Sequence, residues 1–194
     1  GEAPELARMP AKPEGADWGP PFRVTTALQY RADGAGWLEP GHDHLFVLPA
    51  EGGTPRRLTS GPYDHGGPLS WTPDGEALVF GANRHEDHVR DPVDSEVHRV
   101  DVSTGEITAL TDRRGPDGSP VVSPSGDRIA YLGFDDRRQG YQVTRLHVME
   151  ADGSNPRVVT PGLDRSVGSP AWAEDGRAVY VQYDDEGNTK LARV

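Results

Sequence analysis

The chain has 194 residues with 31 Asp and Glu against 20 Lys and Arg, a formal net charge of −11, and it contains no cysteine. The missing cysteines exclude a disulfide scaffold, a Cys-ligated zinc site, an iron–sulfur cluster and a thiol nucleophile. The acidic balance argues against a nucleic-acid partner or an anionic membrane surface, because both need clustered Lys and Arg.

Residues 1–21 are expected to form an extended leader. This stretch lacks the basic and then apolar segments of a signal peptide. No apolar run in the chain approaches the roughly 20 residues of a transmembrane helix, so no membrane span is predicted. We expect a cytoplasmic protein, since cysteine-free chains fit that compartment, although a periplasmic protein without disulfides would have the same composition.

After the leader, short apolar runs alternate with turn residues, which indicates an all-β fold. The chain holds 24 Gly and 18 Pro, and they fall between runs that are rich in β-branched and aromatic residues. These runs occupy 45–48, 77–80, 128–134 and 178–183.

A hairpin motif occurs three times. Its copies are GPLSWTPDGEALVF (67–80), SPVVSPSGDRIAY (119–131) and SPAWAEDGRAVYV (169–181). Gly75, Gly126 and Gly176 align at the centre of each copy, with a tight turn before each glycine that suits a hairpin. Trp71, Trp172, Phe80 and Tyr131 recur at fixed positions around it and are expected in the core between repeats.

A second motif repeats in step with the first. Its copies are LFVLPAEGGTPRRLT (45–59), VHRVDVSTGEITALT (97–111) and LHVMEADGSNPRVVT (146–160). In each copy the closing Thr comes 14 residues after the first apolar residue. Two registers that agree indicate a repeat of about 50 residues, and each repeat holds four short strands, a to d.

Four-stranded antiparallel sheets that stack radially form a β-propeller. The blade units are 22–59, 66–111, 117–160 and a half unit over 168–194 that ends inside strand c. About three and a half blades cannot close a ring, because propellers typically have 4–8. We therefore interpret the chain as an incomplete propeller from a longer protein, with open blade faces that favour self-association.

The W-x-P-D-G unit, followed by a strand that ends in Leu-Thr, resembles the repeats of TolB-like propellers. Longer segments resemble the propeller of the acylaminoacyl-peptidase branch of the prolyl oligopeptidase family of serine peptidases. They are YRADGAGWLE (30–39), HLFVLPAEGGTPRRLTSGPYDHGGPLSWTPDG (44–75), DDRRQGYQVTRLHVM (135–149) and QYDDEGNTKLARV (182–194). The resemblance implies a propeller that precedes an α/β-hydrolase domain and restricts access of peptides to its Ser-Asp-His triad.

The sequence has no G-x-S-x-G nucleophile elbow and no βαβ alternation. No catalytic residue is therefore assigned, and no cofactor is predicted. The expected function is to gate and orient peptide substrates for a hydrolase domain of the parent chain. The alternative is a TolB-like module that binds a protein or peptide and has no enzymatic activity.

The loops between strands b and c are expected to carry the site, because function concentrates on long, varied loops over a rigid scaffold. They span 81–96, 133–144 and 182–189. The candidate substrate or domain-interface residues are Arg84, Asp136, Arg137, Arg138 and Tyr141. Arginine can bind a peptide carboxylate or an interface Asp or Glu in a bidentate manner. Surface ion pairs and loop packing are the alternative interpretation.

The segment 83–96 has metal-ligating residue types but no defined spacing. It contains His85, Glu86, Asp87, His88, Asp91 and Asp94. Zinc would favour two His and a carboxylate, yet the segment matches no known motif and includes a proline. We interpret it as a solvated acidic loop and predict no metal ligand. Residues 184–188 are likewise interpreted as a hairpin turn rather than a calcium loop.

Overall fold

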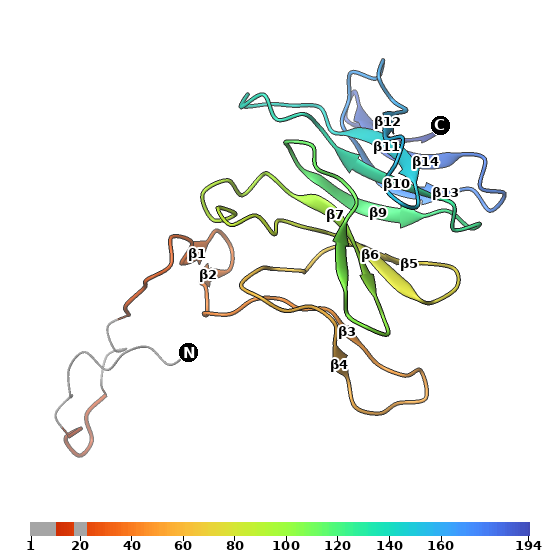
Figure 1. Ribbon diagram of the computed structural model, residues 1–194. Coiled ribbons are helices and arrows are strands. Elements are labelled where there is room, and N and C mark those ends of the chain that lie inside the picture. Colours follow the sequence, from red (N-terminus) through yellow and green to blue (C-terminus); the bar gives the residue numbers. More distant parts are fainter. Residues whose placement is uncertain (1–10, 18–22) are drawn as a thin grey trace. The chain divides into compact units, whose positions relative to one another are not determined.

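The computed structural model describes residues 11–17 and 23–194 and divides into two parts, one that ends at Gly41 and one over 42–194 (Figure 1). Its regular secondary structure is entirely β within the described residues, as predicted. None of those residues forms a helix long and apolar enough to cross a membrane. The expected leader over 1–21 lies largely outside the described residues.

Within its described residues, the first part contains one small hairpin, formed by β1 (Arg31–Ala32) and β2 (Gly36–Trp37). The rings of Tyr30 and Trp37 lie 5.2 Å apart at its base. The predicted unit over 22–59 therefore contains two separate two-stranded sheets, since its second hairpin belongs to the other part.

The second part consists of four antiparallel sheets, which we call blades 1 to 4. Blade 1 is β3 (Phe46–Val47) and β4 (Arg56–Arg57). Blade 2 is β5 (Leu69–Trp71), β6 (Ala77–Ala82), β7 (Glu96–Asp101) and β8 (Ile107–Ala109). Blade 3 is β9 (Asp117–Val122), β10 (Arg128–Gly133), β11 (Arg145–Glu150) and β12 (Arg157–Val158). Blade 4 is β13 (Val167–Trp172), β14 (Val179–Asp185) and β15 (Asn188–Arg193).

The turn between strands a and b is the same in blades 2, 3 and 4. Gly75, Gly126 and Gly176 have φ of 74°, 80° and 66°, a region that glycine enters without steric cost. Each donates its N–H to the carbonyl oxygen three residues earlier at 2.9 Å. The aligned glycines thus predicted the hairpins correctly.

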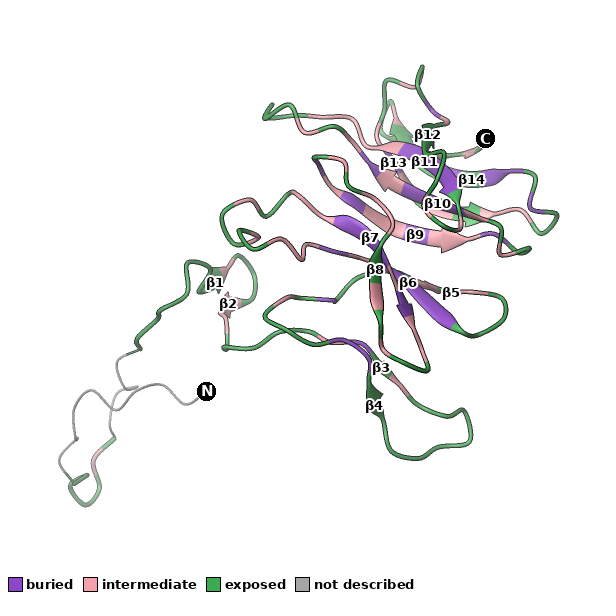
Figure 2. Ribbon diagram, viewed as in Figure 1, coloured by how far each residue is buried: buried purple, intermediate pink, exposed green. Residues whose placement is uncertain are grey.

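The blades stack face to face, as Figure 2 shows by the buried central strands. Successive side chains of a strand point to opposite faces. In β6, Leu78 and Phe80 pack toward blade 1, whereas Val79 packs against Ile129 and Tyr131 of blade 3. A third cluster joins blades 3 and 4. The predicted incomplete propeller is confirmed, because none of these sheets closes into a ring.

Two details differ from the expectation. Trp71 is 48% exposed, whereas Phe80 and Tyr131 are buried. Trp172 donates its indole N–H to the carbonyl of Val121 on the preceding strand a, and the part 42–194 holds no such strand before Trp71. The third b–c loop is also short, since β14 and β15 are joined by Glu186 and Gly187 alone.

The outer face of blade 4 is uncovered within 42–194. Tyr180 occupies the repeat position of Val79 and Ala130, yet it is 36% exposed while they are buried. Leu191 pairs with Gln182 just as Leu146 pairs with Leu132, and it is 67% exposed where Leu146 is fully buried. This face therefore keeps the apolar residues of a stacking surface.

Candidate functional site

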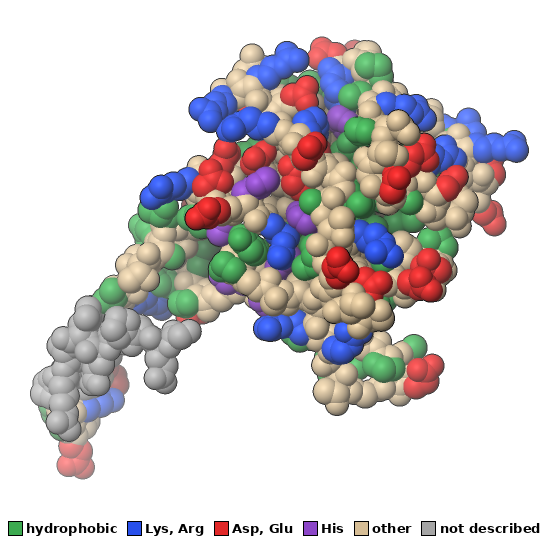
Figure 3. All heavy atoms as spheres, in the orientation of Figure 1, with side chains coloured by type: hydrophobic (Ala, Val, Ile, Leu, Met, Phe, Trp, Pro, Cys, Tyr) green, Lys and Arg blue, Asp and Glu red, His purple; other side chains and the backbone are tan. Residues whose placement is uncertain are grey.

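The two long b–c loops are 83–95 in blade 2 and 134–144 in blade 3. The second loop borders a pocket of 390 Å³, which we call the rim pocket. Its lining comprises Phe134, Asp135, Arg137, Gln139, Tyr141, Gln142, Val143, Arg145, His147, Val158 and Pro161. Figure 3 shows Lys and Arg side chains gathered at the upper left, over this loop. The volume lies in the range of small-molecule sites.

The loop is held in shape by Asp136. Its Oδ1 accepts hydrogen bonds from the backbone N–H of Arg138 and from Nε2 of Gln142, both at 2.8 Å. The hydrogen bond from Gln142 lowers the pKa of Asp136 most, and the bond from Arg138 adds to this effect. Asp136 therefore stays ionised at the centre of the turn. Arg138 has a φ of 54° at this turn. Neither residue lines the pocket.

Arg137 and Tyr141 are the two predicted site residues that line the pocket. The backbone N–H of Arg137 donates to Oε1 of Gln142 at 2.7 Å, which fixes the backbone while the side chain stays exposed. Tyr141 is 73% exposed. The lining of the pocket therefore includes one exposed arginine and one exposed tyrosine.

Strand β11 supplies the inner wall through Arg145 and His147. Nη1 of Arg145 donates to the carbonyls of Thr160 and Pro161 at 2.9 and 2.7 Å. The ring of His147 stacks on Tyr131 with centroids 4.9 Å apart. Burial, with a smaller contribution from Arg113, lowers the pKa of His147 to about 4. Its Nε2 is buried and has no hydrogen-bond partner in the described residues.

The connection between blades 2 and 3 ties both loops together. Arg113 forms ion pairs with buried Asp117 and with Asp135 of the pocket wall. Burial raises the pKa of Asp117 to about 7 although Arg113 opposes the shift. Arg114 pairs with Asp91 in the other loop at 2.6 Å. One short segment thus positions the loops on either side of it.

Arg84 lies apart from the rim pocket, which it does not line. Its guanidinium lies over the ring of Tyr63, 4.9 Å from the centroid, and contacts Nε2 of His65. Burial lowers the pKa of His65. Arg84 therefore packs the connection between blades 1 and 2 onto the loop 83–95.

The sequence interpretation missed Arg145, His147 and Arg113. A signal for His147 was present, because it shares its repeat position with His98 in the second motif. A histidine that recurs at the same position of an otherwise apolar strand is a signal, because its buried ring nitrogens need hydrogen-bond partners. For Arg113 no such pattern exists, since its role depends on two carboxylates that only the blade stacking brings near.

Residues 24–132 match the family described as the dipeptidyl peptidase IV N-terminal region, which is more than half of the chain. The chain belongs to this family. It is 28% identical over 146 residues to an uncharacterized protein of Agrobacterium fabrum. This alignment covers 72% of this chain and 47% of that protein. The chain is 35% identical over 78 residues to dipeptidyl-peptidase 5 of Trichophyton schoenleinii, which covers 40% of this chain and 11% of that protein.

The fold resembles that of TolB from Acinetobacter baumannii, with a TM-score of 0.59 and 19% identity. The match covers 77% of this chain and 34% of TolB. The chain thus spans less than half of the length of each of these three proteins. The predicted resemblance to prolyl oligopeptidase-type and TolB-like propellers is confirmed.

Proposed function

We propose that this chain is the non-catalytic propeller of a serine peptidase of the acylaminoacyl-peptidase or dipeptidyl-peptidase type. Its role is to gate and orient peptides for an α/β-hydrolase domain outside these 194 residues. Family membership supports this proposal, and the observation that carries it is the rim pocket with Arg137 and Tyr141 in its lining.

The pocket chemistry suits a short peptide with a free carboxylate. Arg137 offers a bidentate pair to that carboxylate, and Tyr141 can pack against a side chain. His147 lies at the inner wall, where its Nε2 is buried and has no hydrogen-bond partner among the described residues. Val143 and Val158 add apolar surface for the rest of the ligand.

Binding of fluorescein-labelled di- to tetrapeptides to the chain, measured by anisotropy, tests the pocket. Arg137→Ala should weaken binding about 10-fold or more, because charge-assisted hydrogen bonds contribute about 1.5–3 kcal/mol. Peptides with an amidated C-terminus should bind the native chain as weakly as free-acid peptides bind the Arg137→Ala variant. Arg177→Ala, an exposed arginine in the a–b turn of blade 4, is the matched control and should bind normally. Equal affinity of both variants for the free-acid peptides would contradict the proposal.

The gating role is tested in the full-length protein. The double variant Arg137→Ala, Arg138→Ala should lower kcat/KM for peptides while hydrolysis of a small ester is retained. Unchanged kcat/KM for peptides at unchanged stability would remove the gating role.

The alternative is a TolB-like module that binds a protein or peptide without an attached enzyme, and the fold likeness to TolB is what favours it. Sequencing of the gene beyond the codon of Val194 separates the two functions, because only a peptidase needs a downstream G-x-S-x-G segment. A serine-directed fluorophosphonate should not label the 194-residue chain. Labelling would contradict both functions.

We also propose a cytoplasmic location, to be tested by fractionation of expressing cells. The isolated chain is further proposed to self-associate through the outer face of blade 4, where Tyr180 and Leu191 are exposed. A second copy is the proposed occupant, because every other blade face of this repeat position is buried against a neighbouring sheet.

A further inference from the structure

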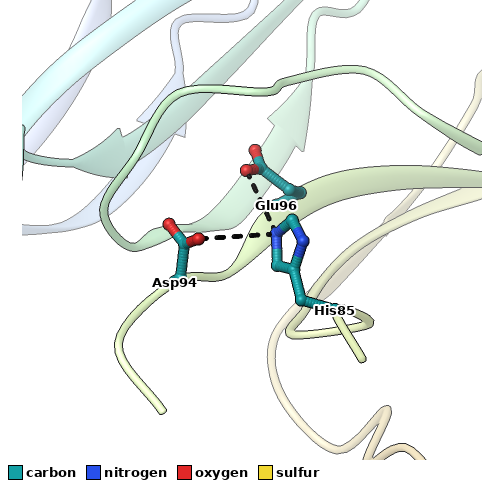
Figure 4. Close-up of side chains that lie close together, drawn as sticks. All are labelled: His85, Asp94 and Glu96. Carbon is teal, nitrogen blue, oxygen red and sulfur yellow. Dashed lines mark ion pairs between the residues drawn. The ribbon is translucent and has the colours of Figure 1, made fainter. Parts of the chain in front are cut away.

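Three side chains of blade 2 converge at one point, as Figure 4 shows. His85 comes from the start of the loop 83–95, Asp94 from its end and Glu96 from the first residue of β7. Nε2 of His85 lies 3.8 Å from Oδ2 of Asp94 and 3.6 Å from Oε1 of Glu96. One ligand atom from each residue falls within 4.8 Å of the other two.

These separations are too long for hydrogen bonds, which require about 2.7–3.2 Å between nitrogen and oxygen. Nε2 of His85 is shielded from solvent and has no hydrogen-bond partner in the described residues. A buried ring nitrogen without a partner costs free energy. The geometry therefore leaves room for an atom between the imidazole and the two carboxylates.

The remaining oxygens of both carboxylates are already engaged. The hydroxyl of Thr111 donates to Oε2 of Glu96, and the backbone N–H of Gly115 donates to Oδ1 of Asp94 at 2.9 Å. Such outer contacts hold ligands in orientation around a metal. Each carboxylate thus directs its other oxygen toward His85.

Neither carboxylate of the cluster has a Lys or Arg partner among the described residues. Glu96 has a side chain only 6% exposed, and His85 is its sole ion-pair partner among the described residues. Asp94 likewise pairs with His85 and with no Lys or Arg in that part of the chain.

We propose that His85, Asp94 and Glu96 bind a divalent first-row transition metal of the Zn²⁺ or Mn²⁺ class. Ligand atoms about 2.1 Å from a tetrahedral ion lie about 3.4 Å apart, close to the observed 3.6 and 3.8 Å. The imidazole favours these ions over Mg²⁺ and Ca²⁺, which prefer all-oxygen sites. Three protein ligands leave a position for water or another ligand.

The proposed site differs from the interpretation of the segment as a solvated acidic loop, which stays a prediction. Glu86 and Asp87 are exposed and lie outside the cluster, whereas the ligand set takes Glu96 from the strand. His88 also lies outside the cluster, and its Nδ1 contacts the carbonyl of His85 at 3.0 Å. The run of acids and histidines in the sequence therefore included two of the proposed ligands, His85 and Asp94, but not Glu96.

Calorimetric titration of the EDTA-treated chain with ZnCl₂ and MnCl₂ tests the site. We expect one equivalent of at least one ion to bind, a rise in Tm with its concentration, and no comparable effect of MgCl₂. His85→Gln, Asp94→Asn and Glu96→Gln should each weaken binding at least 10-fold. His88→Gln and Glu86→Gln, from the same loop, are the matched controls and should retain it.

A measurement on the native chain makes the result independent of variant folding. In ¹⁵N-edited NMR spectra of the imidazole groups, one histidine should shift at Nε2 on saturation with Zn²⁺, and that signal should be absent in His85→Gln. No binding of either transition metal, undiminished binding by the three ligand variants, or loss in His88→Gln would overturn the site.

Discussion

The hydroxyl oxygen of Thr111 accepts a hydrogen bond from the backbone N–H of Val97 at 2.9 Å. Thr59 accepts from Leu45 at 2.9 Å and Thr160 from Leu146 at 3.0 Å in the same way. The residue before each Thr also donates its N–H to the carbonyl of the same apolar residue. The constant interval of 14 residues thus reflects a clasp between strands c and d, because a shift of one residue would leave both groups unpaired.

Removal of the clasp hydroxyl should destabilise a blade. We predict that Thr160→Val lowers the free energy of unfolding by about 1–3 kcal/mol, because the buried N–H of Leu146 loses its acceptor. Thr160→Ser keeps the oxygen and is the matched control. Urea unfolding followed by tryptophan fluorescence measures both, and equal losses for Val and Ser would refute the role of the hydrogen bond.

The fold was predictable because its determinants are local. Gly75 and its two counterparts fix the turns by their backbone conformation, and each clasp Thr fixes the c–d pairing within 15 residues. The alternation of Leu78, Val79 and Phe80 then gives each sheet two apolar faces that need neighbours. The exposure of Trp71 was not predictable, because the repeat pattern does not reveal that the part 42–194 has no strand a before β5 to cover it.

The candidate site was predictable only in part. Loop length and composition pointed to Arg137 and Tyr141, which do line the rim pocket. The inner wall and the metal cluster depend on distances through space between residues of different strands and loops. Glu96, for example, lies near His85 only because the ten intervening residues form a loop that brings the start of β7 back beside His85.

The connection between blades 2 and 3 should control the shape of the rim pocket. Gly115 has a φ of 134°, and a Cβ atom there would overlap the carbonyl of Phe134 and lie 2.9 Å from the backbone N of Asp136. We predict that Gly115→Ala costs about 1–3 kcal/mol and weakens peptide binding, since the loop must move. In Gly140→Ala, which changes the loop 134–144 itself, the added Cβ meets no atom within 4 Å, so this variant is the control.

Limited proteolysis between residues 134 and 144 provides the readout for Gly115→Ala, together with peptide anisotropy. Faster cleavage than in Gly140→Ala is expected. The same cleavage rate and the same peptide affinity in both variants would show that the segment does not position the loop.

His147 should make the stability of the chain fall in mild acid. Burial beside Arg113 and Arg145 lowers its pKa from 6.5 to about 4, with Asp135 opposing. Between pH 6.5 and 4 the unfolded chain binds a proton that the folded chain does not, so the free energy of unfolding decreases as pH falls through this window. The loss attributable to His147 is about 3 kcal/mol at most.

His147→Phe preserves the ring that stacks on Tyr131 and removes the titration. Its unfolding free energy should therefore fall less than that of the native chain between pH 6.5 and 4. Urea unfolding at half-unit pH steps measures the difference. Parallel curves for the two proteins would contradict a neutral, buried His147.

The outer face of blade 4 should determine the oligomeric state of the isolated chain. Tyr180 and Leu191 occupy positions that are buried in blades 2 and 3, and exposed apolar surface of this kind favours association. We predict concentration-dependent association in sedimentation velocity, and a monomer for the double variant Tyr180→Lys, Leu191→Lys. Val89→Lys, an exposed apolar residue of the loop 83–95, should associate like the native chain. A native chain that stays monomeric at high concentration would contradict self-association through the outer face of blade 4.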